Sequence, residues 1–578
     1  MKRKLIYGTG AVLAVLLLAW FTLQLTWRVS SVSGTVTNQG KAVAGATVRV
    51  KATTFKTVTD ANGKFSLTGF LPKFNVPVTA WQDGYYVGGQ TALPWQRNLT
   101  ISLEPYRTGD NQQYAWIPPQ VTGRTLWEEV MVKLGLPLTA KLSFNHLFLP
   151  LSAKLPLGCA DCHGSPVYEE YAANAHAKGA DNIIFRTTYN GTDTRGNQSP
   201  PTRYGFSRDY GRFPLPPDPT QPWYGPGFKL DFPDQAGNCA NCHEPGQALN
   251  EPNNTDINKL PANAVRGTHC DFCHKIVDIK LDPATRLPLE NMTGVLSMRL
   301  CRPDGEPQIF FGPFDDVDVG PDTYLPLQNE SRACAACHSA SFWGTPIYQS
   351  YNEWLNSPYP AEGKTCQTCH MKPNGVTVNF APGRGGLDRD PQQIFSHTFP
   401  GAADNKLLQN TAKLEVSATR KDNIVTVKVT VTNENGGHDI PTDQPMRNIV
   451  LLVEATDSSG KPLVYQGNQT VPEWGGTGKG PGNYAGRPGK GYAKILQELW
   501  TEVSPSIAYW KQTKILTDNR IAARATDVSN YEFQVPAGSG PVTVTGKLIF
   551  RRAFIQLAEQ KGWNAPDILM NQVAVVIP

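Results

Sequence analysis

The sequence predicts a multidomain protein in which a loop-rich, partly α-helical central region lies between an N-terminal and a C-terminal β-sandwich. A length of 578 residues suggests three or four domains. Residues 30–105 and 411–578 alternate between apolar and polar side chains, as half-buried strands do. The region between them has few long periodic segments, and the chain as a whole holds 52 Gly and 47 Pro, more than an average protein.

The composition excludes several classes of protein. Only 18% of residues are charged, aromatic residues reach 10%, and the net charge is +5. This balance does not suit a disordered chain, a coiled coil, collagen or a polytopic membrane protein. The small excess of basic residues also does not indicate a nucleic-acid-binding surface.

The first 29 residues predict a signal anchor. Lys-Arg-Lys at residues 2–4 precedes an almost wholly apolar run over residues 5–27, which is long enough to span a bilayer. No Ala-x-Ala cleavage site follows the run. We therefore expect one transmembrane helix within 1–29 that anchors the chain to the cytoplasmic membrane, with the rest in the periplasm or at the cell surface.

Residues 30–105 read as short strands separated by turns. Asp60-Ala-Asn62-Gly63 predicts a tight turn between two of them. Together with Gly34-Thr-Val, Gly45-Ala-Thr-Val and Gly84-Tyr85, this segment resembles the carboxypeptidase regulatory-like domain. The resemblance implies a small β-sandwich that serves as a spacer or docking module without chemistry of its own.

Residues 106–157 are interpreted as a connector. Leu126, Val130 and Leu134 recur at helical spacing within it, and Gly135 ends the run. We expect the central domain to cover residues 158–410.

The central region contains one pattern five times. Ten of the eleven cysteines occur as Cys-x-x-Cys, and a histidine follows each second cysteine. This spacing is the attachment signature of c-type haem, in which two thiols form thioethers and the histidine becomes the proximal iron ligand. Zinc ribbons or disulfides are the alternatives, but neither explains the repeated histidine. The predicted haem-attaching and proximal residues are Cys159, Cys162 and His163; Cys239, Cys242 and His243; Cys270, Cys273 and His274; Cys334, Cys337 and His338; and Cys366, Cys369 and His370.

The remaining histidines match the motifs in number. The chain has ten His, so five are left as candidate distal ligands: His146, His176, His269, His397 and His438. Five haems and five spare histidines favour bis-histidine ligation throughout. Met371 follows His370 directly and is not expected to be a ligand, so the haem potentials should be low. The eleventh cysteine, Cys301, is interpreted as a buried inert thiol.

The spacing of the motifs indicates neighbouring haems. Their first cysteines are 80, 31, 64 and 32 residues apart, so the second and third form one close pair and the fourth and fifth another. Two other segments also resemble each other. Tyr168-Glu-Glu-Tyr171 is followed by His176, and the similar Tyr351-Asn-Glu-Trp354 is followed by Tyr359. Both stretches predict short amphipathic helices. Haems so closely spaced along the chain should lie near one another, as rapid electron hopping requires.

Residues 411–578 predict a second β-sandwich. Asp457-Ser-Ser-Gly460 and Pro536-Ala-Gly538 are typical of hairpin turns. Between them, residues 493–500 are interpreted as a helical insertion.

The motifs and the domain order resemble the extracytoplasmic multihaem cytochromes related to hydroxylamine oxidoreductase and the tetrahaem cytochromes of ammonia oxidisers. The resemblance rests on Gly363-Lys-Thr-Cys-Gln-Thr-Cys-His-Met371, His397-Thr-Phe-Pro-Gly401 and Asn435-Gly-Gly-His438-Asp-Ile-Pro-Thr442. It implies bis-His haems in a stacked chain, with the post-motif histidines serving haems other than the nearest. Two features depart from the group's patterns. Tyr359 occupies the position equivalent to His176 in the second of the two similar segments, and no Cys-x-x-Cys-Lys motif occurs.

Three functions remain open. The favoured one is extracytoplasmic electron transfer through five haems, with redox proteins or a quinol-linked membrane complex as partners. The second is an oxidoreductase in which one open haem acts on a small nitrogen or sulfur compound. The third is a cytochrome that assembles into a homo-oligomer or filament and conducts as a haem wire.

Overall fold

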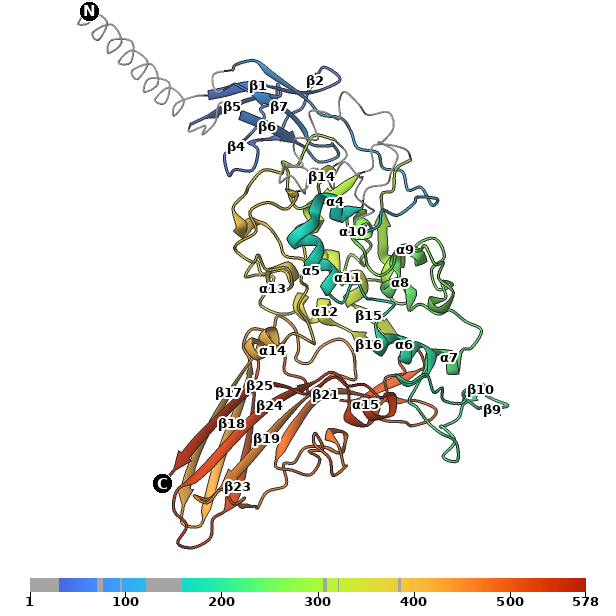
Figure 1. Ribbon diagram of the computed structural model, residues 1–578, viewed down its shortest axis with the longest axis vertical. Helices are drawn as coiled ribbons and strands as arrows, with labels where there is room; N and C mark the ends of the chain where they lie inside the picture. The colour runs from blue at the N-terminus through green and yellow to red at the C-terminus, as the bar shows by residue number, and fades with distance from the viewer. Residues whose placement is uncertain are drawn as a thin grey trace, which may run out of the picture.

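The computed structural model describes residues 31–69, 76–93, 96–120, 158–304, 309–320, 322–382 and 386–578. The predicted anchor within 1–29, the predicted helix at 126–134 and His146 lie outside these residues. Figure 1 shows three regions along the long axis: an N-terminal β domain at one end, a central region of short helices, and a C-terminal β domain at the other end. The predicted multidomain architecture, with many sheets and few helices, is thus confirmed.

The N-terminal domain consists of two four-stranded sheets. One has the order β2-β1-β5 with β8 parallel to β1, and the other has the order β4-β3-β6-β7. Val36, Val48 and Ile101 lie in the core between them. The strand bounds are β1 Ser31–Asn38, β2 Lys41–Ala42, β3 Thr47–Val50, β4 Lys56–Val58, β5 Lys64–Thr68, β6 Val76–Trp81, β7 Gly88–Ala92 and β8 Leu99–Ser102.

The predicted turn at Asp60 is present, and it connects β4 to β5. The Asp60 carboxylate accepts hydrogen bonds from the backbone N–H groups of Asn62 and Lys64, at 2.9 and 2.8 Å. Gly63 completes the turn at a φ of 70°, which favours glycine. The turn residues read from the sequence therefore set the point at which the chain passes from one sheet to the other.

Ion pairs join the N-terminal domain to the central region. Arg49 on β3 binds Asp315 through two hydrogen bonds of 2.9 and 3.0 Å. The backbone N–H of Ala52 donates to Asp316, whose carboxylate also pairs with Arg389 at 2.8 Å. Both members of this second pair are almost fully buried. The β domain therefore packs directly against the central region.

The central region is built from short elements. Its longest helix, α6, has eight residues. The helices are α4 Cys159–His163, α5 Glu169–Ala173, α6 Ile183–Asn190, α7 Phe228–Asp231, α8 Ala240–His243, α9 Pro245–Ala248, α10 Cys270–Cys273, α11 Arg332–His338, α12 Ser350–Leu355, α13 Cys366–His370 and α14 Asn405–Thr411. Four two-stranded sheets accompany them: β9 Tyr204–Ser207 with β10 Gly211–Pro214, β11 Ile276–Ile279 with β12 Met298–Leu300, β13 Phe310–Gly312 with β14 Asp322–Tyr324, and β15 Ala340–Phe342 with β16 Thr345–Tyr348. The two predicted amphipathic helices are α5 and α12.

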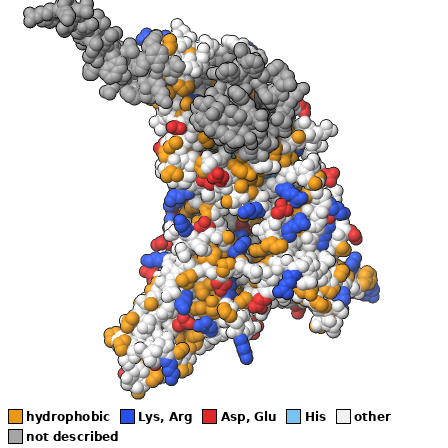
Figure 2. Space-filling model, viewed as in Figure 1, with side chains coloured by type: hydrophobic (Ala, Val, Ile, Leu, Met, Phe, Trp, Pro, Cys, Tyr) orange, Lys and Arg blue, Asp and Glu red, His pale blue; other side chains and the backbone are white. Residues whose placement is uncertain are grey.

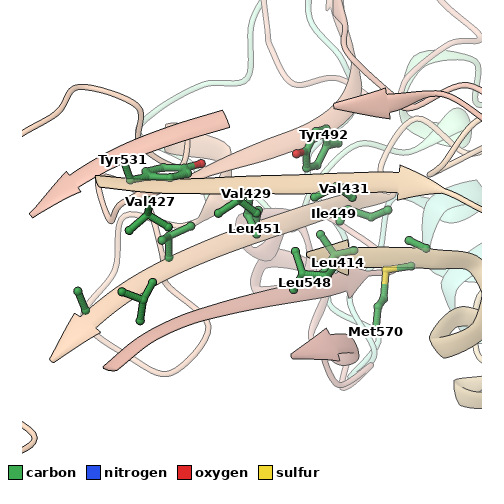
Figure 3. Packing of buried hydrophobic residues seen from close by; sticks show 14 of the residues in the cluster. Leu414, Val427, Val429, Val431, Ile449, Leu451, Tyr492, Tyr531, Leu548 and Met570 are labelled. Atoms are coloured by element: carbon green, nitrogen blue, oxygen red, sulfur yellow. The ribbon is translucent and has the colours of Figure 1, made fainter. Parts of the chain in front are cut away.

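The C-terminal domain pairs a four-stranded sheet, β17-β18-β23-β20, with a five-stranded sheet, β22-β21-β19-β24-β25. Figure 3 shows how side chains of both sheets, such as Val429 and Leu451, meet in its core. The strand bounds are β17 Ala412–Lys421, β18 Ile424–Asn433, β19 Asn448–Thr456, β20 Val464–Tyr465, β21 Gly489–Glu498, β22 Thr513–Asp518, β23 Thr526–Gln534, β24 Val542–Arg551 and β25 Ile568–Ile577, with one helix, α15 Ile555–Lys561.

The predicted helical insertion at residues 493–500 is wrong. Most of this stretch belongs to β21, which lies inside the five-stranded sheet between β19 and β22. Nearly all of its residues are buried, because both faces of this strand are covered. A strand covered on both faces shows no polar alternation, and a short apolar run of that kind can be mistaken for a buried helix. The turn at Pro536 likewise joins strands of two different sheets, β23 and β24, instead of a hairpin.

Two buried lysines fasten the C-terminal domain to the central region. The Lys561 ammonium donates to the carbonyl oxygens of Thr187, Thr192 and Pro226, at 2.7 to 3.2 Å. Lys494 donates to the carbonyl oxygens of residues 346 and 347. Burial lowers the pKa of Lys561 to about 7 and that of Lys494 to about 8. Such groups require a closely fitted interface, because each would otherwise leave buried polar atoms unsatisfied.

Within the described residues, no helix is long and apolar enough to cross a membrane. On the face drawn in Figure 2, lysine and arginine side chains are interspersed with aspartate and glutamate. That face therefore carries no extended patch of a single charge.

Candidate haem attachment sites

All five Cys-x-x-Cys-His motifs adopt helical turns in the central region. They coincide with α4, α8, α10, α11 and α13 (Figure 1). In a helix, side chains three and four positions apart lie on the same face. The two thiols and the imidazole of each motif are therefore directed to the same side, as attachment to one porphyrin requires.

Each motif histidine is oriented by a hydrogen bond at Nδ1. In four motifs the acceptor is a backbone carbonyl oxygen. A metal-bound imidazole needs its second nitrogen held in this way, because that bond fixes the tautomer and the orientation of the ring and leaves Nε2 for the metal. The four bonds are His163 to Phe380 at 2.8 Å, His243 to Gly179 at 3.2 Å, His274 to Phe311 at 2.7 Å and His370 to Pro400 at 2.7 Å.

The fifth motif histidine, His338, has a carboxylate as its acceptor. Its Nδ1 lies 3.0 Å from Oδ2 of Asp443, which belongs to the C-terminal domain. Burial alone would lower the pKa of His338, but the hydrogen bond and the charge of Asp443 raise it to about 9. Sequence reasoning missed Asp443. In the sequence, the only feature that pointed to it was the position of an acidic residue shortly after the candidate ligand His438.

The exposure of the motif residues fits a covalently attached group. All ten motif cysteines are partly or fully exposed, whereas Cys301 is buried. The side chain of His338 is 44% exposed although its helix neighbours Ala335 and Ala336 are buried completely. The motif side chains are thus more accessible than Cys301, as covalent attachment requires.

Two of the predicted distal histidines lie close to motif histidines. The ring centroids of His176 and His338 are 6.4 Å apart, and so are those of His438 and His370. With metal–nitrogen bonds of about 2 Å, two imidazoles on opposite faces of one iron have centroids roughly 6 Å apart. The two ring pairs therefore have the spacing of bis-histidine ligands. Their planes are inclined at 78° in the first pair and 14° in the second.

His397 lies near two motif histidines. Burial, followed by the positive charges of His274 and His163, lowers the pKa of His397 to about 3. Its backbone N–H donates to Glu170 at 2.7 Å, and its carbonyl oxygen accepts from Asn174 at 2.7 Å. The segment that carries His397 is thus fixed beside the first and third motifs.

His269 has a different environment. Its Nδ1 accepts a hydrogen bond of 3.2 Å from the backbone N–H of Phe272, so the side chain caps the N-terminus of α10. Its Nε2 is buried without a partner among the described residues, and its ring contacts are Trp116 and Phe272. When Nδ1 accepts, the proton of a neutral imidazole resides on Nε2. This geometry suits a helix cap better than an iron bond at Nε2.

Tyr359, which occupies the position equivalent to His176 in the similar segment, supports the loop that carries His438. Its side chain is buried, and its hydroxyl lies 3.4 Å from the carbonyl oxygen of Glu434. A Cβ atom at Gly437 would come within 3.4 Å of the Tyr359 ring. The tyrosine therefore packs directly beneath the backbone that leads to His438.

Thiol contacts show which motifs are neighbours. Cys270 raises the pKa of Cys159, Cys242 raises that of Cys337, and Cys366 raises that of Cys334, so the two thiols of each pair lie close together. Cys273 is also within electrostatic range of Cys337. The first motif thus adjoins the third, while the fourth adjoins the second, the third and the fifth. Neighbours in space are not always neighbours along the chain, and the fourth motif is central.

Cys301 is a buried thiol, as predicted. Its Sγ donates to the carbonyl oxygen of Arg107 at 2.8 Å, and burial raises its pKa to about 11. All eleven cysteines are free of disulfides. Among the described residues, no group of three or more His, Cys, Asp or Glu side chains is arranged to hold a metal ion.

Comparison with known proteins identifies a family for the N-terminal domain of this chain. The chain matches no curated protein. Among solved structures, a penta-heme cytochrome c552 from Thermochromatium tepidum is similar, with a TM-score of 0.49, 20% identity, and coverage of 72% of this chain and 97% of that chain. The N-terminal domain of the Streptococcus gordonii adhesin Sgo0707 matches with a TM-score of 0.12 and 14% identity, over 30% of this chain and 33% of that one. Residues 31–104 match the family model of the carboxypeptidase regulatory-like domain, which confirms the predicted family of the N-terminal β-sandwich.

Proposed function

We propose that this protein is an extracytoplasmic electron carrier with five covalently attached c-type haems. The observation that carries the proposal is the pairing of His176 with His338 and of His438 with His370 at the spacing of two ligands on one iron. These histidines would hold the iron from both sides, so a substrate would have to displace one of them, whereas electron transfer would need no free position.

The residues of the chain hold and orient the haems. The motif cysteines would form the thioether links, and the motif histidines would bind the iron through Nε2, since Nδ1 is engaged elsewhere. The haem supplies one-electron redox chemistry when bound. His176 and His438 are the proposed distal ligands at the fourth and fifth motifs. His146, His269 and His397 are the candidates left for the other three, and the capping geometry makes His269 the least suited of them.

The thiol contacts support a continuous path for electrons. The order first, third, fourth, fifth connects four motifs, and the second joins at the fourth. Each step links haems whose attachment points are adjacent, so transfer between them would not need large movements. The central position of the fourth motif makes its haem the branch point of the proposed path.

The setting of the proposed carrier follows from the sequence. Attachment of c-type haem and the predicted anchor at 1–29 favour the periplasm or the cell surface, with redox proteins or a quinol-linked membrane complex as partners. The resemblance to the cytochromes related to hydroxylamine oxidoreductase supports the same assignment. The N-terminal β domain would act as a spacer between the membrane and the haems.

Cofactor stoichiometry tests the proposal. Five complete motifs should give five haems, adding roughly 3 kDa to the mass of the chain at about 0.6 kDa per haem. A pyridine haemochrome assay combined with intact mass measurement gives the count. Fully matured protein with four or fewer haems would refute the five-haem proposal.

One observation favours a second function, that of a multihaem oxidoreductase. If His269 caps α10 and does not bind iron, one haem has a free axial position. Such a haem could act on a small nitrogen or sulfur compound. The geometry of His269 is the specific support for this alternative.

A further inference from the structure

The acceptor of His338 distinguishes the fourth motif from the other four. Asp443 is only 9% exposed, and its two carboxylate oxygens are fixed separately. One accepts from His338 at 3.0 Å and the other from the backbone N–H of Ser350 at 3.1 Å. The other motif histidines have neutral carbonyl acceptors at the same position.

A carboxylate acts on the imidazole more strongly than a carbonyl group does. A hydrogen bond to an ionised acceptor is about twice as strong as one between neutral groups. It draws the Nδ1 proton away from the ring and makes Nε2 a more basic donor. A more basic ligand stabilises ferric over ferrous iron, and a buried negative charge nearby acts in the same direction.

The surroundings keep Asp443 ionised. Both of its carboxylate oxygens accept N–H hydrogen bonds, from His338 and from Ser350, and such bonds favour the ionised form. Arg447 lies close enough to act on the carboxylate electrostatically, and it offsets part of its charge. The nearby acids Asp439 and Glu353 are paired with Arg520.

We propose that Asp443 is a positioning residue that holds the reduction potential of the haem at the fourth motif below the value that a neutral acceptor would give. This inference rests on the proposed function, since it requires a haem at His338. Because the fourth motif adjoins three others, the potential of its haem controls how electrons divide among the branches. The C-terminal β domain would thus regulate the branch point through one side chain.

The experiment is a potentiometric titration of the full chain with all five haems. Asp443→Asn keeps the shape and an acceptor oxygen but removes the charge, so it should shift one haem potential in five to a more positive value. Asp443→Glu should restore the lower potential. The matched control is Asp527→Asn, which removes a carboxylate of the same domain that binds Lys490 and Tyr492. It should leave all five potentials unchanged.

A measurement on the unmodified protein serves if Asp443→Asn does not load its haems. Ferric haems with nearly perpendicular imidazole planes give a more anisotropic EPR signal than those with parallel planes. The ring planes are inclined at 78° in the His176–His338 pair and at 14° in the His370–His438 pair, so the two signals can be distinguished. Because Asp443 would lower the potential of the first haem, its ferric signal should persist longer than that of the second as the applied potential is lowered. Unchanged potentials in five-haem Asp443→Asn, or the opposite order of disappearance, would overturn the inference. Fewer than five haems in the unmodified protein would instead refute the proposed function.

Discussion

Replacing His438 by alanine should convert one haem in five to a high-spin form that binds carbon monoxide, while all five haems stay attached. His438 lies opposite His370 with nearly parallel rings, and the loop that carries it is firmly held. The Asn433 amide donates to the His438 carbonyl oxygen at 2.8 Å, and Asn433 accepts from the backbone N–H of Gly436. Loss of the imidazole would leave the iron at the fifth motif with one protein ligand. Optical spectra of the ferric protein and of the reduced protein with carbon monoxide would detect the change.

A matched control for this variant is Tyr359→Phe. It removes the hydroxyl that contacts the Glu434 carbonyl oxygen but keeps the ring beneath the His438 loop. All haems should then remain low-spin. If His438→Ala also remained fully low-spin and unreactive, His438 would not be a ligand, and the assignment of the fifth haem would fail.

Replacing Arg520 by leucine should lower the free energy of unfolding by about 3–5 kcal/mol, as expected when one partner of a buried ion pair is removed. Arg520 is 6% exposed and pairs with Glu353 of α12 at 2.6 Å. It also binds Asp439 and Asp518, at 3.2 and 2.7 Å. Without the guanidinium, the carboxylates of Glu353, Asp439 and Asp518 would all lose a direct ion-pair partner.

The same substitution should also affect the haems. Glu353 accepts hydrogen bonds from Thr442 and from the backbone N–H of Asp439, so it fixes the loop between His438 and Asp443. Calorimetry would report stability, and EPR would report the fourth and fifth haems. The control is Lys413→Met, which breaks an exposed pair with Glu415 and should cost less than about 1 kcal/mol. A similarly small effect of Arg520→Leu would show that this network does not stabilise the docked domain.

Local sequence patterns predicted much of the architecture. The strands of the N-terminal domain follow from alternation, as in Lys64–Thr68, where buried and exposed residues alternate. The five Cys-x-x-Cys-His motifs are contiguous, so the sequence alone could identify their residues as candidate haem sites. The helix predicted at residues 493–500 is a strand instead, because β21 is covered on both faces and therefore has no polar alternation.

Contacts between distant segments could not be predicted in this way. Counting the histidines identified His438 as a candidate ligand but not its position opposite His370, since the two lie in different domains. Asp443 and Arg520 carry no local signal, because their roles arise only when the C-terminal domain packs on α11 and α12. The cap formed by His269 depends on a single side-chain orientation, which composition and spacing do not determine.

The most direct test of the proposed carrier is the addition of carbon monoxide to the fully reduced, unmodified protein. If all five irons have two histidine ligands, the haem spectrum should not change. A carbon monoxide adduct at one haem in five would contradict the account, and it would favour an open iron of the kind that the capping geometry of His269 allows.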